Sequence, residues 1–513
     1  MNSSLKVLCI GDNSSADAWA HKLTEKFAKE NNLTFRGELS KDRPIENGCY
    51  HIGPVIHQQK DIIEISKKFD EIVLIDQKQE QFSHSRIFLA TWKLVNDLKD
   101  TGIQVKIMNK ENMEYLDNWG KIFEENKSIC MNPWILLHDG QSGYTNLCGR
   151  NFDRIKKRED INDWQDDEDY NSIRNKMLHG EKISGCNVCN RLEEQGIRDM
   201  RWTDSFDWIS RLQIKTFEDL KKIKNPSYFE VRPSNKCNLK CRMCKPQWSH
   251  LIYQETDSIK DKKFKEIANK IVDEQVFNTS SFNLVDLDSM VRLYIAGGEP
   301  TVMPEVYEFL RNCVKNKKTD FELNINTNAV KISEKLFDLF KNFPKLWFTV
   351  SIDGVGKINE YQRWGTDSKK QIENIHRLKN NGAGIHIISV ISIYNVHDIG
   401  KTMQFFDSEF PYARVQLNWA GYSKDILNPR DHPNTDLVLR SLEIAKSTKC
   451  YYHQERGSKP IIDSLYRHYS SSPKLNKEKL SNFFYYNDTL DRYRGSKLVD
   501  YIPELEEYSK YIK

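Results

Sequence analysis

Three cysteines stand close together near the middle of this sequence, at Cys237, Cys241 and Cys244, with the spacing C-x3-C-x2-C. Three thiolates on one short loop can hold three corners of an iron–sulfur cluster or three positions of a zinc site, because both bind soft sulfur ligands. No fourth cysteine follows nearby, and three protein ligands out of four leave an open coordination position where chemistry can take place. Packing alone does not explain three thiols at this spacing.

This spacing resembles the signature of the radical S-adenosylmethionine (SAM) superfamily. The resemblance implies that the three cysteines bind three irons of a [4Fe–4S] cluster and that the fourth iron chelates SAM. SAM would then be cleaved to methionine and a 5′-deoxyadenosyl radical, which abstracts hydrogen from a substrate. One departure is Met243, where the family usually has an aromatic residue before the last cysteine. The alternative is a zinc knuckle with His250 as the fourth ligand, although its spacing from Cys244 matches no zinc pattern.

From residue 228 to about residue 421, candidate strands alternate with helical stretches. Strands are predicted at 228–232, 292–295, 322–325, 347–352, 384–393 and 414–419. Strands that alternate with helices indicate an α/β fold with a parallel sheet. Together with the resemblance, they predict a partial (β/α)6 barrel of the TIM type over residues 226–425. In barrels of this type the chemistry lies at the C-terminal ends of the strands.

Short polar motifs follow three of these strands: Gly297-Gly298-Glu299, Asn326-Thr327-Asn328 and Ser351-Ile352-Asp353-Gly354. Two glycines let a backbone approach a ligand closely, and carbonyls and a carboxylate can accept hydrogen bonds from an ammonium group. The family commonly has glycine where this chain has Asn328, a residue type that visits left-handed conformations readily.

The resemblance implies a set of SAM-binding residues at these strand ends. They are Gly297, Gly298, Glu299, Asn326, Ser351, Asp353 and Arg363, with Ser392, Asn395 and Asn418 as further candidates for the ribose or adenine. Arg363 would pair with the SAM carboxylate, since a guanidinium fork fits a carboxylate. The alternative for Arg363 is an ordinary surface arginine.

A second cysteine set comprises Cys130, Cys148, Cys186 and Cys189. The first two frame C-x12-G-x4-C, in which residues 139–143 predict a tight hairpin turn, and the last two form C-x2-C. The pattern resembles the SPASM and twitch domains, which hold auxiliary [4Fe–4S] clusters, and it implies one auxiliary cluster in a small cysteine-rich domain at 121–200. The later C-x5-C-x3-C part is missing, and the segment precedes the barrel instead of following it. Structural zinc held by four cysteines is the alternative.

The two ends of the chain are predicted to form further domains. Residues 1–120 alternate strands at 6–11, 33–36, 71–76 and 104–108 with helical stretches at 15–31, 61–68 and 85–100, which is typical of a Rossmann-like α/β domain. Gly11-Asp12-Asn13 could bind a polar ligand, but the dinucleotide fingerprint G-x-G-x-x-G is absent, and a docking or scaffold role is the alternative. Residues 426–513 are predicted as a helical extension with helices at 435–447 and 459–469.

The composition and charge are those of an ordinary globular protein. A formal charge of +4 over 513 residues gives no argument for a nucleic-acid or membrane partner, and 38% hydrophobic with 29% charged residues indicates a cytoplasmic globular protein. We therefore expect a radical SAM oxidoreductase or transferase that takes electrons from a donor such as flavodoxin or ferredoxin. Its substrate would be a peptide or protein side chain, or a small sugar- or nucleotide-like molecule. The alternative is a non-catalytic interaction protein that binds zinc or Fe–S.

Overall fold

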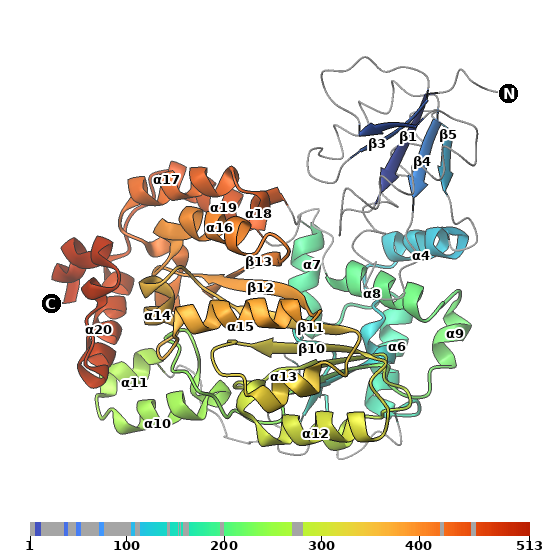
Figure 1. The fold of residues 1–513 in the computed structure, drawn as a ribbon, viewed down its shortest axis with the longest axis horizontal. Coiled ribbons are helices and arrows are strands. Elements are labelled where there is room, and N and C mark those ends of the chain that lie inside the picture. The colour runs from blue at the N-terminus through green and yellow to red at the C-terminus, as the bar shows by residue number, and fades with distance from the viewer. Residues whose placement is uncertain are drawn as a thin grey trace. The chain divides into compact units, whose positions relative to one another are not determined.

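The computed structural model describes five strands within the first 112 residues and then residues 113–512, apart from 141–143, 152, 154, 157–163, 195–199, 269–280, 421–424 and 453–457. The chain divides into two compact units, whose helices and strands are labelled in Figure 1. The first unit comprises residues 1–135 and 165–224, and the second comprises residues 136–164 and 225–513. Each unit is described by itself.

The first unit contains a five-stranded sheet with the strand order β2-β3-β1-β4-β5, and its strand pairs are parallel. The strands are β1 (Lys6–Gly11), β2 (Phe35–Glu38), β3 (Gly48–Ile52), β4 (Glu71–Ile75) and β5 (Gln104–Ile107). The sequence predicted four of them to within two residues and missed β3. The predicted helices at 15–31, 61–68 and 85–100 lie outside the described residues, as do Asp12 and Asn13.

Helices complete the first unit around an aromatic core. They are α4 (Met113–Glu125), α5 (Asn132–Ile135), α6 (Glu168–Leu178), α7 (Asn187–Glu194), α8 (Met200–Arg211) and α9 (Phe217–Lys221). Phe123 on α4 packs against Trp202 and Phe206 on α8, with ring centroids 5.3 Å apart in both pairs. Large buried rings of this kind dominate the energetics of a small core.

The second unit is built on an eight-stranded sheet with the order β13-β12-β11-β10-β9-β8-β6-β7. Its strands are β6 (Leu136–Asp139), β7 (Thr145–Asn146), β8 (Tyr228–Val231), β9 (Arg292–Ile295), β10 (Glu322–Thr327), β11 (Leu346–Ser351), β12 (Gly384–Ile391) and β13 (Arg414–Trp419). All six predicted strands are present, with ends shifted by at most two residues. The mixed α/β fold with a parallel sheet is confirmed.

Strands β6 and β7 form the hairpin that the sequence predicted, since His138 pairs antiparallel with Asn146. The turn residues 141–143 lie outside the described part of the chain. The sequence did not predict that β6 also pairs in parallel with β8, with Leu136 opposite Tyr228. Leu136 and Leu137 are almost fully buried, and this short apolar run extends the sheet beyond β8.

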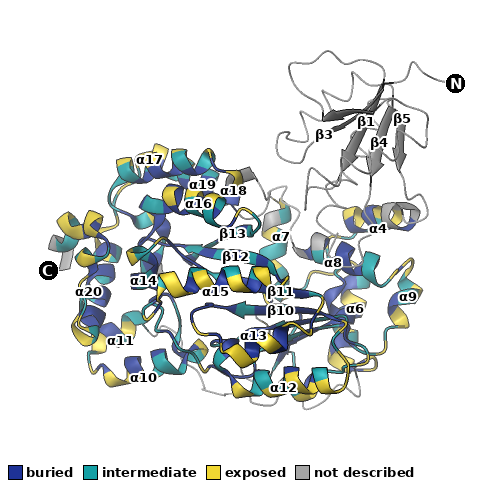
Figure 2. Ribbon diagram, in the orientation of Figure 1, coloured by how far each residue is buried: buried dark blue, intermediate teal, exposed yellow. Residues whose placement is uncertain are grey.

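One face of the central strands is apolar and the other is polar, as the two-residue period of a strand requires. In β9 and β10, Leu293, Ile295, Leu323 and Ile325 are all fully buried. The apolar face packs on helices, as Phe348 of β11 shows by its contact with Phe340, at a centroid distance of 5.0 Å. Helices α12 (Pro304–Lys315), α13 (Glu334–Phe340), α15 (Ser368–Asn380) and α16 (Ile399–Glu409) follow β9 to β12 in turn. Figure 2 shows that these helices also carry exposed residues, whereas the strands are buried or intermediate.

The C-terminal extension is helical, with α17 (Thr435–Lys446), α18 (Lys449–Tyr452), α19 (Ser458–Ser470), α20 (Lys477–Arg494) and a 3-10 segment at Pro503–Ile512. The two helices predicted here are confirmed, and α20 was not predicted. Asn476 caps α20 by accepting a hydrogen bond from the Lys479 amide, and Gly495 ends it in a left-handed conformation. No helix in the described part of the chain is both long enough and apolar enough to cross a membrane.

Candidate functional site

The loop that carries Cys237, Cys241 and Cys244 begins where β8 ends, and on one side it lies against the Gly297-Gly298 segment after β9. The Gly298 amide donates to the Ser234 carbonyl at 3.1 Å, and the Glu299 amide donates to the Lys236 carbonyl at 2.7 Å. A Cβ atom on Gly298 would lie 2.1 Å from the Lys236 oxygen, and one on Gly297 would lie 2.6 Å from the Ser234 oxygen. Gly297 also has a φ of +124°. The two glycines therefore allow two backbones to touch.

On its other side the cysteine loop lies against the segment that follows α14 (Lys357–Gln362). The Lys240 amide donates to the Trp364 carbonyl at 2.9 Å, and the Arg242 amide donates to the Gln362 carbonyl at 2.7 Å. Gly365, with a φ of +97°, passes close to Leu239. The loop is thus held by backbone hydrogen bonds on both sides.

The three cysteine residues of this loop are each of intermediate exposure. Burial, together with the negative charges of Cys241, Glu299 and Cys244, raises the pKa of the Cys237 thiol. Burial also raises the pKa of Cys241, while the positive charge of Arg363 acts in the opposite direction. In the part of the chain that the structure describes, no three His, Cys, Asp or Glu side chains are drawn together as a metal site.

The donor set fits an Fe–S cluster. Three thiols on one loop are near enough to repel one another as thiolates, and a bound cluster would take the place of their protons and remove that repulsion. They follow the C-terminal end of β8, where the ends of the neighbouring parallel strands bring further polar groups.

His250, the fourth ligand of the alternative zinc site, takes part in the loop itself. Its Nδ1 accepts a hydrogen bond from the Cys237 amide at 3.2 Å. This hydrogen bond places the proton of the neutral ring on Nε2. His250 thus fixes the start of the cysteine loop through this hydrogen bond.

Glu299 joins the ends of β9 and β10. Its Oε1 accepts from the Thr301 hydroxyl at 2.7 Å and from the Thr327 hydroxyl at 2.6 Å, and its Oε2 accepts from the Asn328 amide at 2.6 Å. Burial raises the pKa of this carboxyl, while these donors act against the shift. The carboxylate is 1% exposed and holds two strand ends in place.

Asp353 and Arg363 form an ion pair, with Nε and Oδ2 2.7 Å apart. Asp353 also accepts a hydrogen bond from the Val390 amide at 2.7 Å and has no exposed surface. Burial would lower the pKa of Arg363, but the charges of Asp353 and Cys241 raise it. Because Arg363 is 9% exposed, the alternative of a surface arginine is wrong.

The two remaining predicted strand-end residues, Asn326 and Ser351, lie at the ends of neighbouring strands. Burial raises the pKa of Tyr294 on β9 to about 12, and the Asn326 side chain acts against this rise. The Ser351 carbonyl accepts from Gln371 Nε2 at 3.1 Å, and the same nitrogen donates to the Asn328 carbonyl at 2.6 Å. Gln371 on α15 therefore links the ends of β10 and β11, a role that the sequence gave no sign of.

Asn328 reaches the cysteine loop directly. Its Nδ2 donates to Asn238 Oδ1 at 2.8 Å, between Cys237 and Cys241. The residue with positive φ at this turn is Ala329, at +55°, so the left-handed conformation expected at Asn328 is found one residue later.

The three weaker candidates are engaged with protein atoms. Ser392 donates to Gln362 Oε1 at 2.8 Å, and Asn395 donates to the Asp353 carbonyl at 2.5 Å; both residues are fully buried. Asn418 accepts from Gln416 at 3.1 Å. Ser392 and Asn395 thus support the backbone around Asp353.

The second cysteine set is divided between the two units. Cys130, Cys186 and Cys189 belong to the first unit and Cys148 to the second. All four are partly exposed. The Ser205 hydroxyl lies 3.9 Å from the Cys130 sulfur.

A polar group on β6 and β8 was missed by the sequence analysis. Arg232 Nη1 lies 2.7 Å from His138 Nε2, and Glu230 Oε2 lies 3.3 Å from the same nitrogen. Burial, followed by the positive charge of Arg232, lowers the pKa of His138 well below its usual value. His138 is therefore neutral at pH 7 and accepts from Arg232, and its contact with Glu230 is not an ion pair.

Comparison with known proteins gives a match over the cysteine loop and the segment from the end of β8 to α16. Residues 231–406 match the family model described as the Radical SAM superfamily. No curated protein matches the chain.

Several solved structures are similar to parts of the chain. Native anSMEcpe with bound AdoMet is 17% identical, with a TM-score of 0.27, over 53% of this chain and 63% of that one. Streptococcus suis SuiB bound to precursor peptide SuiA is 16% identical, with a TM-score of 0.27, over 48% and 57%. TYW1 with a lysine-pyruvate adduct is 18% identical, with a TM-score of 0.25, over 43% and 74%. The chain spans less than two thirds of the first two structures, and TM-scores this low carry no argument about its substrate.

Proposed function

We propose, starting from the radical SAM superfamily domain at residues 231–406, that this chain is an enzyme that cleaves SAM reductively and removes a hydrogen atom from a substrate. The observation that carries the proposal is the cysteine loop, which backbone hydrogen bonds fasten between Gly298-Glu299 on one side and residues 362–364 on the other. When bound there, a [4Fe–4S] cluster supplies the electron that cleaves SAM to methionine and a 5′-deoxyadenosyl radical.

In this proposal Cys237, Cys241 and Cys244 each bind one iron through a thiolate. The absence of a fourth cysteine in the loop leaves the remaining position for the amino and carboxylate groups of SAM. Arg363 offers the SAM carboxylate a guanidinium whose Nε is already paired with Asp353, so its orientation is set before SAM binds.

The residues at the strand ends contribute mainly by positioning. Gly297 and Gly298 keep the cysteine loop against β9, and Glu299 fixes β10 beside it. Asn326 and Ser351 line the same edge of the sheet and are proposed as SAM contacts. A rigid edge of this kind orients SAM toward a substrate C–H bond and keeps water away from a radical.

We also propose a second cluster, of the SPASM or twitch type, held by Cys130, Cys148, Cys186 and Cys189, with zinc as the alternative metal. The N-terminal sheet is proposed to belong to a Rossmann-like domain. The substrate is proposed to be a peptide or protein side chain, or a small sugar- or nucleotide-like molecule. A cytoplasmic flavodoxin or ferredoxin is the proposed source of electrons.

Iron analysis of anaerobically reconstituted protein tests this proposal. We expect about eight irons per chain and a broad brown absorbance, with about four irons lost in Cys241→Ala. Cys313→Ala is the matched control, since Cys313 is fully buried in α12 and belongs to neither cysteine set. If wild-type protein holds about four irons and Cys241→Ala loses all of them, only the proposal of a second cluster is refuted. A colourless protein with stoichiometric zinc would contradict the proposal and favour a non-catalytic zinc-binding protein.

A further inference from the structure

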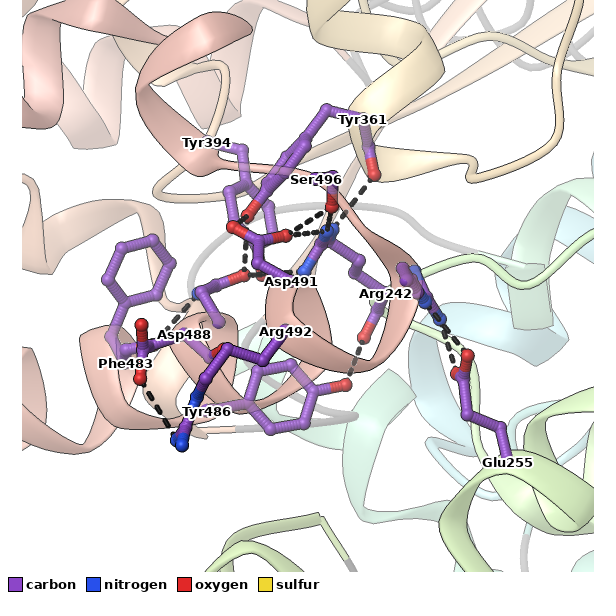
Figure 3. Close-up of polar contacts among 12 residues, drawn as sticks. Arg242, Glu255, Tyr361, Tyr394, Phe483, Tyr486, Asp488, Asp491, Arg492 and Ser496 are labelled. Atoms are coloured by element: carbon purple, nitrogen blue, oxygen red, sulfur yellow. Dashed lines mark hydrogen bonds and ion pairs between the residues drawn. The ribbon is translucent and has the colours of Figure 1, made fainter. Parts of the chain in front are cut away.

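Arg242 stands between two of the proposed cluster ligands, Cys241 and Cys244, yet its side chain has no exposed surface. Its guanidinium is directed at helix α20, as Figure 3 shows. Nη2 donates to Asp491 Oδ1 at 2.5 Å and Nη1 donates to Asn487 Oδ1 at 3.1 Å. The C-terminal helix therefore binds a residue inside the cysteine motif, 249 positions away from Asp491 in the chain.

Arg242 also makes contacts with Tyr361, and its backbone amide and carbonyl both have hydrogen-bond partners. Nε donates to the Tyr361 carbonyl at 3.0 Å, and the guanidinium lies over the Tyr361 ring at 3.6 Å. The backbone amide donates to Gln362, and the backbone carbonyl accepts from the Tyr486 hydroxyl at 3.1 Å. Amide, carbonyl and side chain all have partners, which fixes the conformation of this turn.

Tyr361 and Ser496 complete the surroundings of the buried carboxylate. The Tyr361 hydroxyl donates to Asp491 Oδ2 at 3.0 Å, and the Ser496 hydroxyl donates to Oδ1 at 2.7 Å (Figure 3). Both oxygens of Asp491 are thus satisfied, which a buried ion pair requires if it is not to destabilise the fold.

Met243, the next residue of the motif, enters an apolar cluster made largely by the C-terminal extension. The cluster's buried members include Leu480, Phe483 and Phe484 of α20. Leu498, Ile502 and Leu505, which follow α20, belong to it as well, and Cys241 packs against it. Arg242 and Met243, the two residues between Cys241 and Cys244, are therefore both held by α20 and the residues that follow it.

A second buried ion pair ties α20 to α10 (His250–Ser258), the helix after the cysteine loop. Arg494 Nε and Nη2 donate to the two carboxylate oxygens of Glu255 at 2.9 and 2.5 Å. Both side chains are at most 2% exposed. Lys240, inside the loop, lies 3.6 Å from the same carboxylate.

We infer that α20 is part of the proposed cluster site and that Arg242 is a positioning residue, which fixes the Cys241–Cys244 turn through Asp491. A buried ion pair adds little net stability compared with apolar side chains, and we assign to this pair the role of fixing the geometry of the turn. Binding sites require ligands held to about half an ångström. The inference rests on the proposed function, because the thiols need a fixed geometry only if they bind a cluster.

Hydrogen exchange of the iron-free protein tests the mechanical part without any cluster. Two variants are used. Asp491→Asn keeps the shape of the side chain and removes its charge. Arg242→Lys keeps the positive charge and removes the planar guanidinium, which can bind two partners at once. We expect the peptide that contains the Lys240 and Arg242 amides to exchange about tenfold faster in both variants. The control is Glu322→Gln, which weakens a largely buried ion pair with Arg292 at the opposite ends of β9 and β10. It should leave that peptide unchanged.

The electron paramagnetic resonance spectrum of the reduced, reconstituted protein tests the functional part. We expect both variants to bind less iron than wild type and to give a shifted spectrum, whereas Glu322→Gln gives the wild-type spectrum. Unchanged loop exchange would overturn the inference. Faster exchange with a wild-type spectrum and iron content would also overturn it, because α20 would then serve stability alone. A wild-type protein without any Fe–S spectrum would refute the proposed function, while the exchange data would still report whether α20 holds the loop.

Discussion

Replacing Gly298 with alanine should separate the cysteine loop from the end of β9. The new Cβ would meet the Lys236 carbonyl oxygen at 2.1 Å and the Lys236 and Asn235 carbonyl carbons at 2.6 Å. All three atoms belong to the backbone, so no side chain can turn away, and the two segments must separate by about 1 Å or more. That movement breaks the hydrogen bonds from Gly298 to Ser234 and from Glu299 to Lys236. Overpacking of about 1–3 kcal/mol and two lost bonds of about 1 kcal/mol each give a loss of roughly 3–5 kcal/mol.

Urea unfolding of the iron-free protein, followed by circular dichroism, measures this loss, and iron analysis after reconstitution measures its effect on the site. Gly382→Ala is the matched control, because Gly382 has a φ of +90° but nothing lies within 4 Å of a Cβ there. That variant should lose about 1–2 kcal/mol from backbone strain and bind iron as wild type does. If Gly298→Ala unfolds like wild type and retains its iron, the close approach of the two backbones is refuted.

Three further perturbations test neighbouring parts of the site. Thr327→Val removes the hydroxyl that donates to Glu299 at 2.6 Å, and urea unfolding should show a loss of about 1–3 kcal/mol; an unchanged midpoint would contradict the role of this bond. Burial and Arg232 lower the pKa of His138, so its contribution to stability is complete above pH 6.5 and falls at lower pH by up to about 1.4 kcal/mol per pH unit. In His138→Gln the unfolding free energy should therefore fall less between pH 7 and pH 5 than in wild type. The same pH dependence in both proteins would contradict the lowered pKa of His138. Arg363→Lys loses the fork and should raise the KM for SAM about tenfold or more in 5′-deoxyadenosine assays, whereas an unchanged KM would exclude a contact with SAM.

The strands of the second unit could be predicted from the sequence because apolar residues recur along them and polar motifs follow three of them. β9 and β13 begin and end at the predicted residues, and β11 differs by one residue at each end. The alternation of inward and outward side chains in a strand repeats every two residues, so a stretch of a few residues is enough to detect it. The sequence predicted β6 as part of a hairpin but not as a neighbour of β8. This pairing depends on the free edge of β8, which lies more than eighty residues later in the chain.

The interior of the site was less predictable, because its contacts join distant parts of the chain. Glu299 and Asp353 were singled out as SAM contacts, but the partners that surround them were not. The importance of Arg242 was invisible because its partner Asp491 is 249 residues away. Helix α20 was missed because it is buried on several sides by Phe, Tyr and Asn side chains, which gives no clear amphipathic pattern.

The central claim is that Cys237, Cys241 and Cys244 serve SAM cleavage, and the formation of 5′-deoxyadenosine tests it most directly. Anaerobically reconstituted, chemically reduced protein is incubated with SAM, and the products are separated by chromatography and identified by mass. We predict that wild-type protein releases 5′-deoxyadenosine and methionine even without a substrate, and that Cys241→Ala releases none above the protein-free control. Wild-type protein that carries its iron, binds SAM and still forms no 5′-deoxyadenosine would contradict the claim.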